Sequence, residues 1–196
     1  MSEALIESIL ALVIAIVATI SGWVAFVYQY FSDRPKIRGK ILQVMRGTMQ
    51  NPERPSENLT MFMLFLYLTN ARKNAIHLSD YILEIDTENK FEKMKIVRGL
   101  TAHPVHFMYG QGGEVSIPDF NKGLIYKQSK AVEFGTPFYG YLVFAGDLKY
   151  YKADIRRYRI TCIDVFDHKH KTTTESKKFV DLFYLQEVFG IKIPKA

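Results

Sequence analysis

The sequence predicts a mainly β protein in which an N-terminal transmembrane helix precedes one antiparallel β-sandwich or barrel-like domain with a short C-terminal helix. Three observations support this prediction. Residues 8–32 carry no charge, several later segments have strand-like apolar patterns between turns, and residues 176–190 have apolar residues at helical spacing. We therefore expect a short extracytoplasmic N-terminus (1–8), a transmembrane helix (9–31), a basic juxtamembrane linker (32–38) and a cytosolic β-rich domain (39–196).

The first apolar stretch is long enough to cross a bilayer. At about 1.5 Å per residue, a helix over residues 8–32 exceeds the roughly 30 Å of bilayer hydrocarbon. A cleavable signal would have a basic start and a small-x-small cleavage site, but the chain begins with Glu3 and Glu7 and no such site follows. A buried core helix is the alternative, although core helices seldom run so far without a polar residue. We expect a single-pass anchor.

The residues on either side of this stretch predict its orientation. Positively charged residues stay on the cytoplasmic side of a membrane, and four of them follow the stretch closely, whereas two glutamates precede it. We therefore expect the inner (cytoplasmic) membrane, with the N-terminus outside and the C-terminal domain in the cytoplasm. The single cysteine, Cys162, agrees because it cannot form an internal disulfide. The expected membrane-interface residues are Tyr28, Tyr30, Arg34, Lys36, Arg38 and Lys40.

Small residues recur along one face of the apolar helix at alternating spacings of four and three. Such a face lets two helix backbones approach closely in lipid, and its seven-residue period predicts a left-handed crossing. The alternative is that alanine is common in membrane helices and that the stripe is accidental. We expect a homo-oligomer formed through Ala4, Ser8, Ala11, Ala15, Ala18, Gly22 and Ala25.

Strand candidates fill most of the remaining chain. The segment NLTMFMLFLYLTN (58–70) is apolar on both alternating sets, which predicts a central strand rather than an exposed edge. Residues 71–75 are then expected to form a hairpin connection to a strand over 76–86, and the Gly-rich 109–114 a loop. Ser176 is the expected cap of the C-terminal helix and Gly190 its stop. The other strand candidates are 40–46, 104–109, 139–146, 157–166 and 170–175.

The charge distribution favours anionic partners. The formal net charge is +6, and all 26 Lys and Arg residues follow the apolar stretch. The nearest anionic surface is the lipid bilayer, which attracts juxtamembrane Lys and Arg, so the charge does not imply duplex nucleic acid. The partners that we expect are the bilayer, further copies of this chain, and either a nucleotide second messenger or a cytosolic protein.

The densest basic-aromatic segment is KYYKADIRRYR (149–159). Guanidinium groups bind phosphate in a bidentate fork, and tyrosine rings offer stacking faces, so this composition suits a phosphate-bearing ligand or a lipid headgroup. The alternative is a solvated strand face, where basic and aromatic residues also alternate. The candidate ligand-binding residues are Lys149, Lys152, Arg156, Arg157, Tyr158 and Arg159.

A second candidate site is IDVFDHKHK, where Asp164, Asp167, His168 and His170 supply the carboxylates and imidazoles that zinc, iron or manganese binds. His103 and His106 are further candidates if a hairpin brings them close. Against a metal site, the sequence has no H-E-x-x-H and no paired C-x-x-C. We expect no catalytic residues and no cofactor, and a metal-dependent hydrolase is the alternative function.

Several segments together resemble uncharacterised bacterial single-pass membrane-anchored β-sandwich proteins. They are the apolar helix, the basic step RPKI (34–37), the strand end YLTNARKNAIHL (67–78), GYLVF (140–144) and ITCIDVFDHKHKT (160–172). Asp167 stands where the hairpin of that family usually has glycine. The resemblance implies a fold and no catalytic residues. The layout is also similar to that of the membrane effectors of bacterial nucleotide-triggered immunity, which implies a membrane effector or scaffold whose cytosolic domain binds a ligand or partner.

Overall fold

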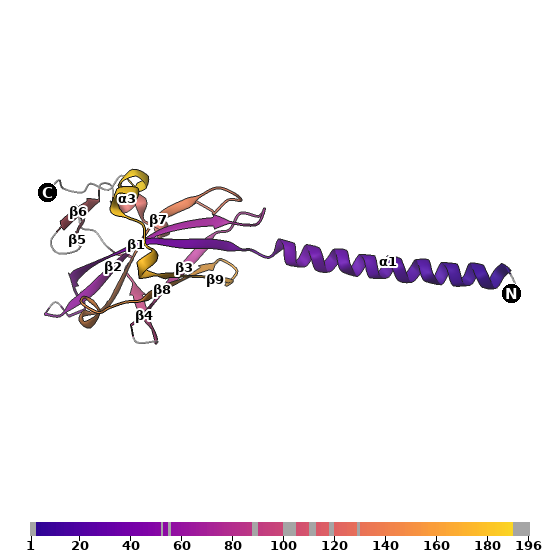
Figure 1. Ribbon diagram of the computed structural model, residues 1–196, viewed down its shortest axis with the longest axis horizontal. Coiled ribbons are helices and arrows are strands. Elements are labelled where there is room, and N and C mark those ends of the chain that lie inside the picture. The colour runs from indigo at the N-terminus through magenta and orange to yellow at the C-terminus, as the bar shows by residue number, and fades with distance from the viewer. Residues whose placement is uncertain are drawn as a thin grey trace.

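A single long helix leaves the β-domain at one end (Figure 1). The computed structural model describes residues 3–51, 53–54, 56–87, 90–99, 105–109, 113–117, 120–128 and 130–189. Helix α1 (Glu3–Asp33) contains a 26-residue stretch, Ile6–Phe31, with a mean hydropathy of 2.5, long and apolar enough to cross a membrane. The hydroxyls of Thr19 and Ser21 donate to the carbonyls of Ala15 and Val17, so both are satisfied within the helix as lipid requires. The expected N-terminal apolar helix is confirmed.

Seven strands form one antiparallel, nearly closed, barrel-like sheet, which confirms the predicted mainly β fold. Their order across the sheet is β1-β2-β7-β4-β3-β8-β9, and β5 and β6 form a separate two-stranded sheet. The strands are β1 (Ile37–Gln50), β2 (Asn58–Asn70), β3 (Leu78–Asp86), β4 (Phe91–Ile96), β5 (Val105–Tyr109), β6 (Gly113–Ile117), β7 (Phe138–Asp147), β8 (Arg157–Asp164) and β9 (Lys169–Glu175). The short helices are α2 (Phe120–Gly123), η1 (Ile125–Lys127), η2 (Leu148–Tyr150), η3 (Ser176–Lys178) and α3 (Leu182–Phe189).

The barrel closes between its first and last strands through side chains rather than a backbone ladder. The N–H of Ile37 donates to Nδ1 of His170 at 3.3 Å, and the N–H of Ile41 donates to Oγ1 of Thr174 at 3.3 Å. Between these bonds, Gly39 faces Thr172, where an added Cβ would lie 2.9 Å from Oγ1. The three β9 residues are spaced by two, so they point to one face of their strand and meet β1 together.

Strand β2 is buried on both faces, as its composition predicted. Phe62 and Leu64 belong to the core inside the barrel. Met63 and Phe65 belong to a second core on the outer face of the sheet, which Phe120 of α2 and Leu185 of α3 cover. A strand with apolar residues on both alternating sets therefore has an apolar layer on each side.

Several sequence predictions about local structure were wrong. Residues 71–75 do not connect a hairpin, because β2 pairs with β1 and β7 while β3 pairs with β4 and β8. The C-terminal helix is capped by Asp181, whose carboxylate accepts the N–H of Tyr184 at 2.9 Å, and not by Ser176, which begins η3. Strand β8 ends at Asp164 rather than residue 166, and strands β4 and β6 were not anticipated.

Candidate functional site

A groove of about 910 Å³ lies at the end of the β-domain opposite α1. Strand β4 pairs with β3 back to Phe91, but it pairs with β7 only at Lys95 and Ile96. Strands β4 and β7 therefore diverge toward the end of the domain at which β1 ends and β2 begins. The groove lies between these diverging ends of β4 and β7. We call this feature the distal groove. Its lining includes all of β4 and residues 145–147 of β7.

The distal groove combines apolar surface with lysines. Met49, Leu59, Met94 and Val97 supply apolar surface, and Gly146 leaves room for the Met94 sulfur, with which a Cβ would collide. Lys90, Lys93 and Lys95 are among the charged residues that line the rest of the groove.

The lining carries four carboxylates and four cations, and three of the carboxylates and one of the cations already have a partner of opposite charge. Glu92 accepts a hydrogen bond from the Tyr150 hydroxyl and lies 3.7 Å from Lys149 Nζ, and these contacts hold the Glu92 pKa below its ordinary value. Arg98 contacts Asp80 at 2.6 Å. Lys90, Lys93 and Lys95 make no ion pair with any described carboxylate, although the charges of Lys90 and Lys93 help to lower the pKa of Glu92 and of Glu84, respectively.

The candidate basic-aromatic residues do not all lie together: Arg156 and Arg157 line one pocket, whereas Lys149 and Tyr158 lie outside it. Tyr158 points into the barrel core, and burial raises its pKa to about 12. Lys149 is beside the distal groove, at 3.7 Å from Glu92. Lys152 and Arg156 are exposed in the irregular segment between η2 and β8.

The other two arginines are paired with carboxylates of the neighbouring strand. Arg159 binds Glu84 in a fork at 2.7 and 2.9 Å, and this bond lowers the Glu84 pKa. Arg157 lies 2.6 Å from buried Asp86, and both guanidinium groups lie over the Phe91 ring. A phosphate would have to compete with these carboxylates for the two guanidinium groups, because each guanidinium already has an anionic partner.

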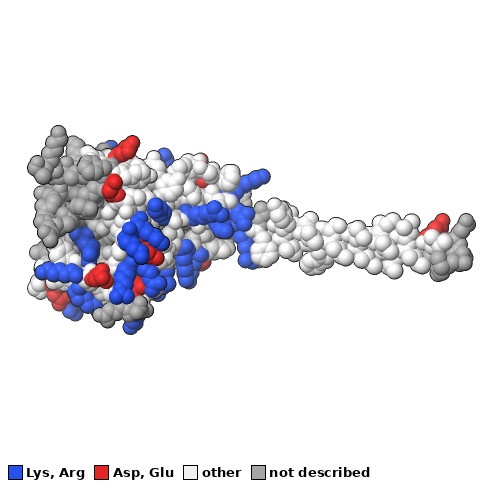
Figure 2. Space-filling model, viewed as in Figure 1, with Lys and Arg blue, Asp and Glu red and all other residues white. Residues whose placement is uncertain are grey.

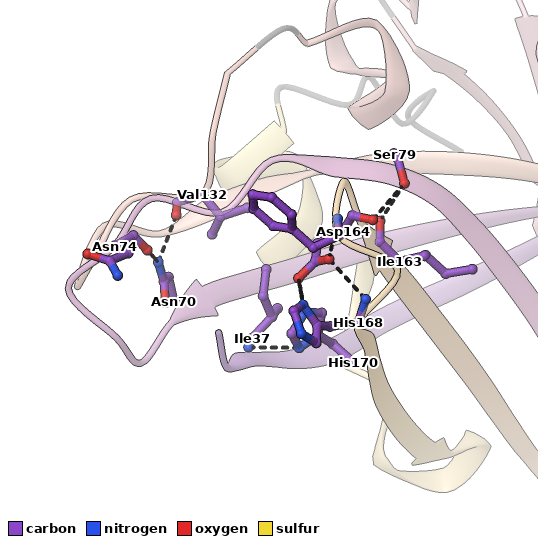
Figure 3. Close-up of polar contacts among 10 residues, drawn as sticks. Ile37, Asn70, Asn74, Ser79, Val132, Ile163, Asp164, His168 and His170 are labelled. Carbon is purple, nitrogen blue, oxygen red and sulfur yellow. Dashed lines mark hydrogen bonds and ion pairs between the residues drawn. The ribbon is translucent and has the colours of Figure 1, made fainter. Parts of the chain in front are cut away.

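The Asp164, His168 and His170 side chains meet beside the closure of the barrel (Figure 3). Asp164 Oδ1 accepts the N–H groups of Phe166 at 2.9 Å and His168 at 3.0 Å. Its Oδ2 lies 3.1 Å from His168 Nδ1 and 3.2 Å from His170 Nε2. Asp167 adopts a φ of 63°, the left-handed conformation that glycine favours, which matches its place in the hairpin.

This arrangement does not make the suggested metal site. The two imidazoles bond to a single carboxylate oxygen, and the described residues contain no group of three or more His, Cys, Asp or Glu that could hold an ion. His103 and the side chain of His106 lie outside the described part of the structure. The cluster orders the β8–β9 turn and holds β9 against β1.

Residues of α1 expected to face lipid or another helix are exposed. From Ser8 to Ala25 the small residues lie on a helix that has no burial in its spanning window, while the side chain of Ala4 is outside the described part. At the other end, the Arg34 guanidinium donates to the Tyr30 hydroxyl at 2.7 Å and lies over its ring. The basic end of the helix is thus tied to its aromatic residues.

No family model and no curated protein matches this chain. Among solved structures, the chain is similar to a putative lipoprotein (ycdA) from Bacillus subtilis subsp. subtilis str. 168, with 12% identity and a TM-score of 0.41. The match covers 80% of this chain and 41% of that one, so this chain spans less than half of its length. A likeness at this identity and score does not identify a function.

Proposed function

We propose that the protein is a non-catalytic, single-pass membrane protein whose β-domain binds an anionic ligand or protein partner in the distal groove. In this proposal α1 spans the inner (cytoplasmic) membrane with its N-terminus outside, and the β-domain lies in the cytoplasm. The distal groove is the observation that carries the proposal. It combines an apolar lining with Lys90, Lys93 and Lys95, which suits a ligand with an anionic group on an apolar or aromatic body.

The place of the groove supports the same function. The chain enters β1 from α1 at Ile37, and the groove lies at the other end of that strand, beside Met49 and Asn51. An anchor at one end of the barrel therefore leaves the groove facing away from the bilayer. A soluble nucleotide or an acidic segment of a cytosolic protein would reach it without crossing the lipid surface.

Self-association through the small-residue face of α1 completes the proposal. The described face is exposed along its length, and Gly22 has no atom within 4 Å of the place where a Cβ would stand. A membrane effector or scaffold in bacterial defence or signalling would use such clustering. Ligand binding would alter helix packing only if the ligand bound two states of the protein with different affinity.

A thermal-shift screen of the full chain in nanodiscs tests groove binding. The probes are ATP, a cyclic dinucleotide, a glutamate-rich peptide and zinc. A probe at a hundredfold excess over its dissociation constant raises the free energy of unfolding by about 2.7 kcal/mol. We expect stabilisation by an anionic probe that Lys93→Glu with Lys95→Glu abolishes.

The matched control is Lys130→Glu with Lys171→Glu, which reverses two exposed lysines outside the groove lining. This variant should keep the response of the wild type. Equal loss of stabilisation in both double variants would mean that net charge, and not the groove, governs binding. Stabilisation by zinc alone would contradict the proposal and favour the metal-dependent hydrolase. No arrangement of the described residues supports that alternative.

A further inference from the structure

Large apolar side chains are exposed on loops at the α1 end of the β-domain. Phe166 is 77% exposed, Phe134 57% and Val165 55%. They come from two loops far apart in sequence, residues 133–137 before β7 and 165–168 between β8 and β9. Single exposed apolar residues are common on protein surfaces. The feature that needs an explanation is that these three residues lie at the same end of the β-domain.

Strand register places these two loops, and residues 71–77 between β2 and β3, at the end where α1 joins. Ile37, the first residue of β1, is paired with Asn70, and Asn70 forms a bridge with Phe134. The N–H of Val165 donates to the His77 carbonyl at 3.1 Å. We call the three segments the α1-side loops. Figure 1 shows this side of the β-domain turned toward the C-terminal end of α1.

The connection to α1 is too short to hold these loops far from a bilayer. Helix α1 ends at Asp33 and β1 begins at Ile37, so three residues join them. An extended chain spans at most roughly 3.6 Å per residue, so the four steps from Asp33 to Ile37 cover at most roughly 14 Å. The Arg72 guanidinium also donates to the Phe31 carbonyl at 3.3 Å, which ties one of the loops to the helix end.

The charge around the α1-side loops is mainly positive. Lys36, Lys73 and Lys169 are exposed there together with Arg34, against the exposed carboxylates of Glu133 and Asp167. Figure 2 shows Lys and Arg gathered where the β-domain meets the helix. Basic residues are drawn to anionic lipid, and aromatic residues are enriched at the membrane interface.

We propose that the α1-side loops form a second membrane contact, in which Phe134, Val165 and Phe166 enter the interface of the anionic bilayer that α1 spans. This contact fixes the β-domain upright on the membrane, with the distal groove facing the cytoplasm. The inference rests on the membrane-spanning part of the proposed function and is independent of ligand binding in the groove. A second copy of the chain is the competing occupant.

Tryptophan quenching by lipid tests this contact, because Trp23 in α1 is the sole tryptophan of the chain. In the full chain carrying Trp23→Phe, the reporter is Phe166→Trp, and the control is Leu148→Trp, at a position 48% exposed beside the distal groove. Both are placed in nanodiscs of phosphatidylcholine and phosphatidylglycerol with brominated acyl chains. We expect blue-shifted, quenched emission at position 166 and unquenched emission at 148. Lys73→Glu with Lys169→Glu should reduce the quenching.

Equal quenching at the two positions would overturn the inference. So would a blue shift at position 166 that grows with protein concentration in detergent without any lipid quenching, because it would place a second copy on the loops. Trp23 in the wild type separates this failure from failure of the anchor. If α1 spans the bilayer, Trp23 is quenched by brominated lipid whatever the loops do.

Discussion

The backbone N–H of Ile37 donates a hydrogen bond to Nδ1 of His170 over 3.3 Å, although 133 residues separate them in the chain. Because Nδ1 accepts this bond, the ring proton is on Nε2, from which it is donated to Asp164 Oδ2 at 3.2 Å. A single imidazole therefore joins the strand that follows α1 to the hairpin that ends the sheet.

Replacing His170 with alanine should destabilise the barrel. The change leaves the Ile37 N–H and one oxygen of buried Asp164 with fewer partners, and an unsatisfied buried group costs about 1–3 kcal/mol. The measurement is urea unfolding of the full chain in mild detergent, followed by circular dichroism. Lys171→Ala, at an exposed position on the same strand, is the control. Equal stability of the two variants would mean that the imidazole does not hold the barrel closed.

Acid should weaken the same cluster. Burial raises the Asp164 pKa, but hydrogen bonds from the His168 and Phe166 N–H groups and from both imidazoles outweigh burial and hold the pKa below its ordinary 3.8. A lowered folded-state pKa gives stability that is present above the unfolded value and lost as the pH falls through the folded value. The stability difference between wild type and Asp164→Asn should therefore shrink as the pH falls below about 4. Denaturation midpoints from pH 6 to pH 2 check this, and a constant difference would contradict it.

Cys162 should be unreactive in the folded protein. It lies in the barrel core, and burial raises its pKa to about 12 from an ordinary 9.0. The thiolate, which is the reactive form, is then roughly a thousandfold scarcer at a given pH. Ellman's reagent should react only after unfolding, whereas Cys162→Ser with Thr173→Cys, which exposes a thiol on β9, should react at once. Rapid reaction of the native wild-type thiol would show that the core opens.

The small-residue face of α1 should govern the oligomeric state. Ala15→Leu with Ala18→Leu places bulk on that face and should lower the mass of the detergent-solubilised protein, because close backbone approach is lost. Ile16→Leu with Ile20→Leu changes neighbouring positions without altering side-chain size. Mass photometry or light scattering would measure both variants. An unchanged mass in the variant with Ala15→Leu and Ala18→Leu would rule out self-association through this face.

The sequence predicted those parts of the fold that depend on local pattern. Strand β2 could be recognised because both of its alternating sets are apolar, and α1 because of its length and lack of charge. Strand β4 was missed because lysines at 93 and 95 interrupt its apolar residues, so that it looks like a solvated segment.

The site was harder to predict because it depends on partners distant in the chain. In the sequence around it, Arg159 looks like a residue that could bind phosphate. Only the fold shows that its guanidinium group already binds Glu84, which is 75 residues away in the chain. The distal groove likewise forms where β4 and β7 diverge, and these two strands are far apart along the chain. A signal was nevertheless present: three lysines within six residues, Lys90 to Lys95, flank the aromatic Phe91.

Extraction and protease digestion of bacterial membranes that contain the full chain test most directly whether α1 holds the β-domain on the cytoplasmic face of a membrane. The protein should stay in the membrane after an alkaline carbonate wash. Its β-domain should be digested in inverted inner-membrane vesicles and protected in spheroplasts. Release by carbonate would show that α1 does not span the bilayer, and digestion in spheroplasts would place the β-domain, and with it the distal groove, outside the cell.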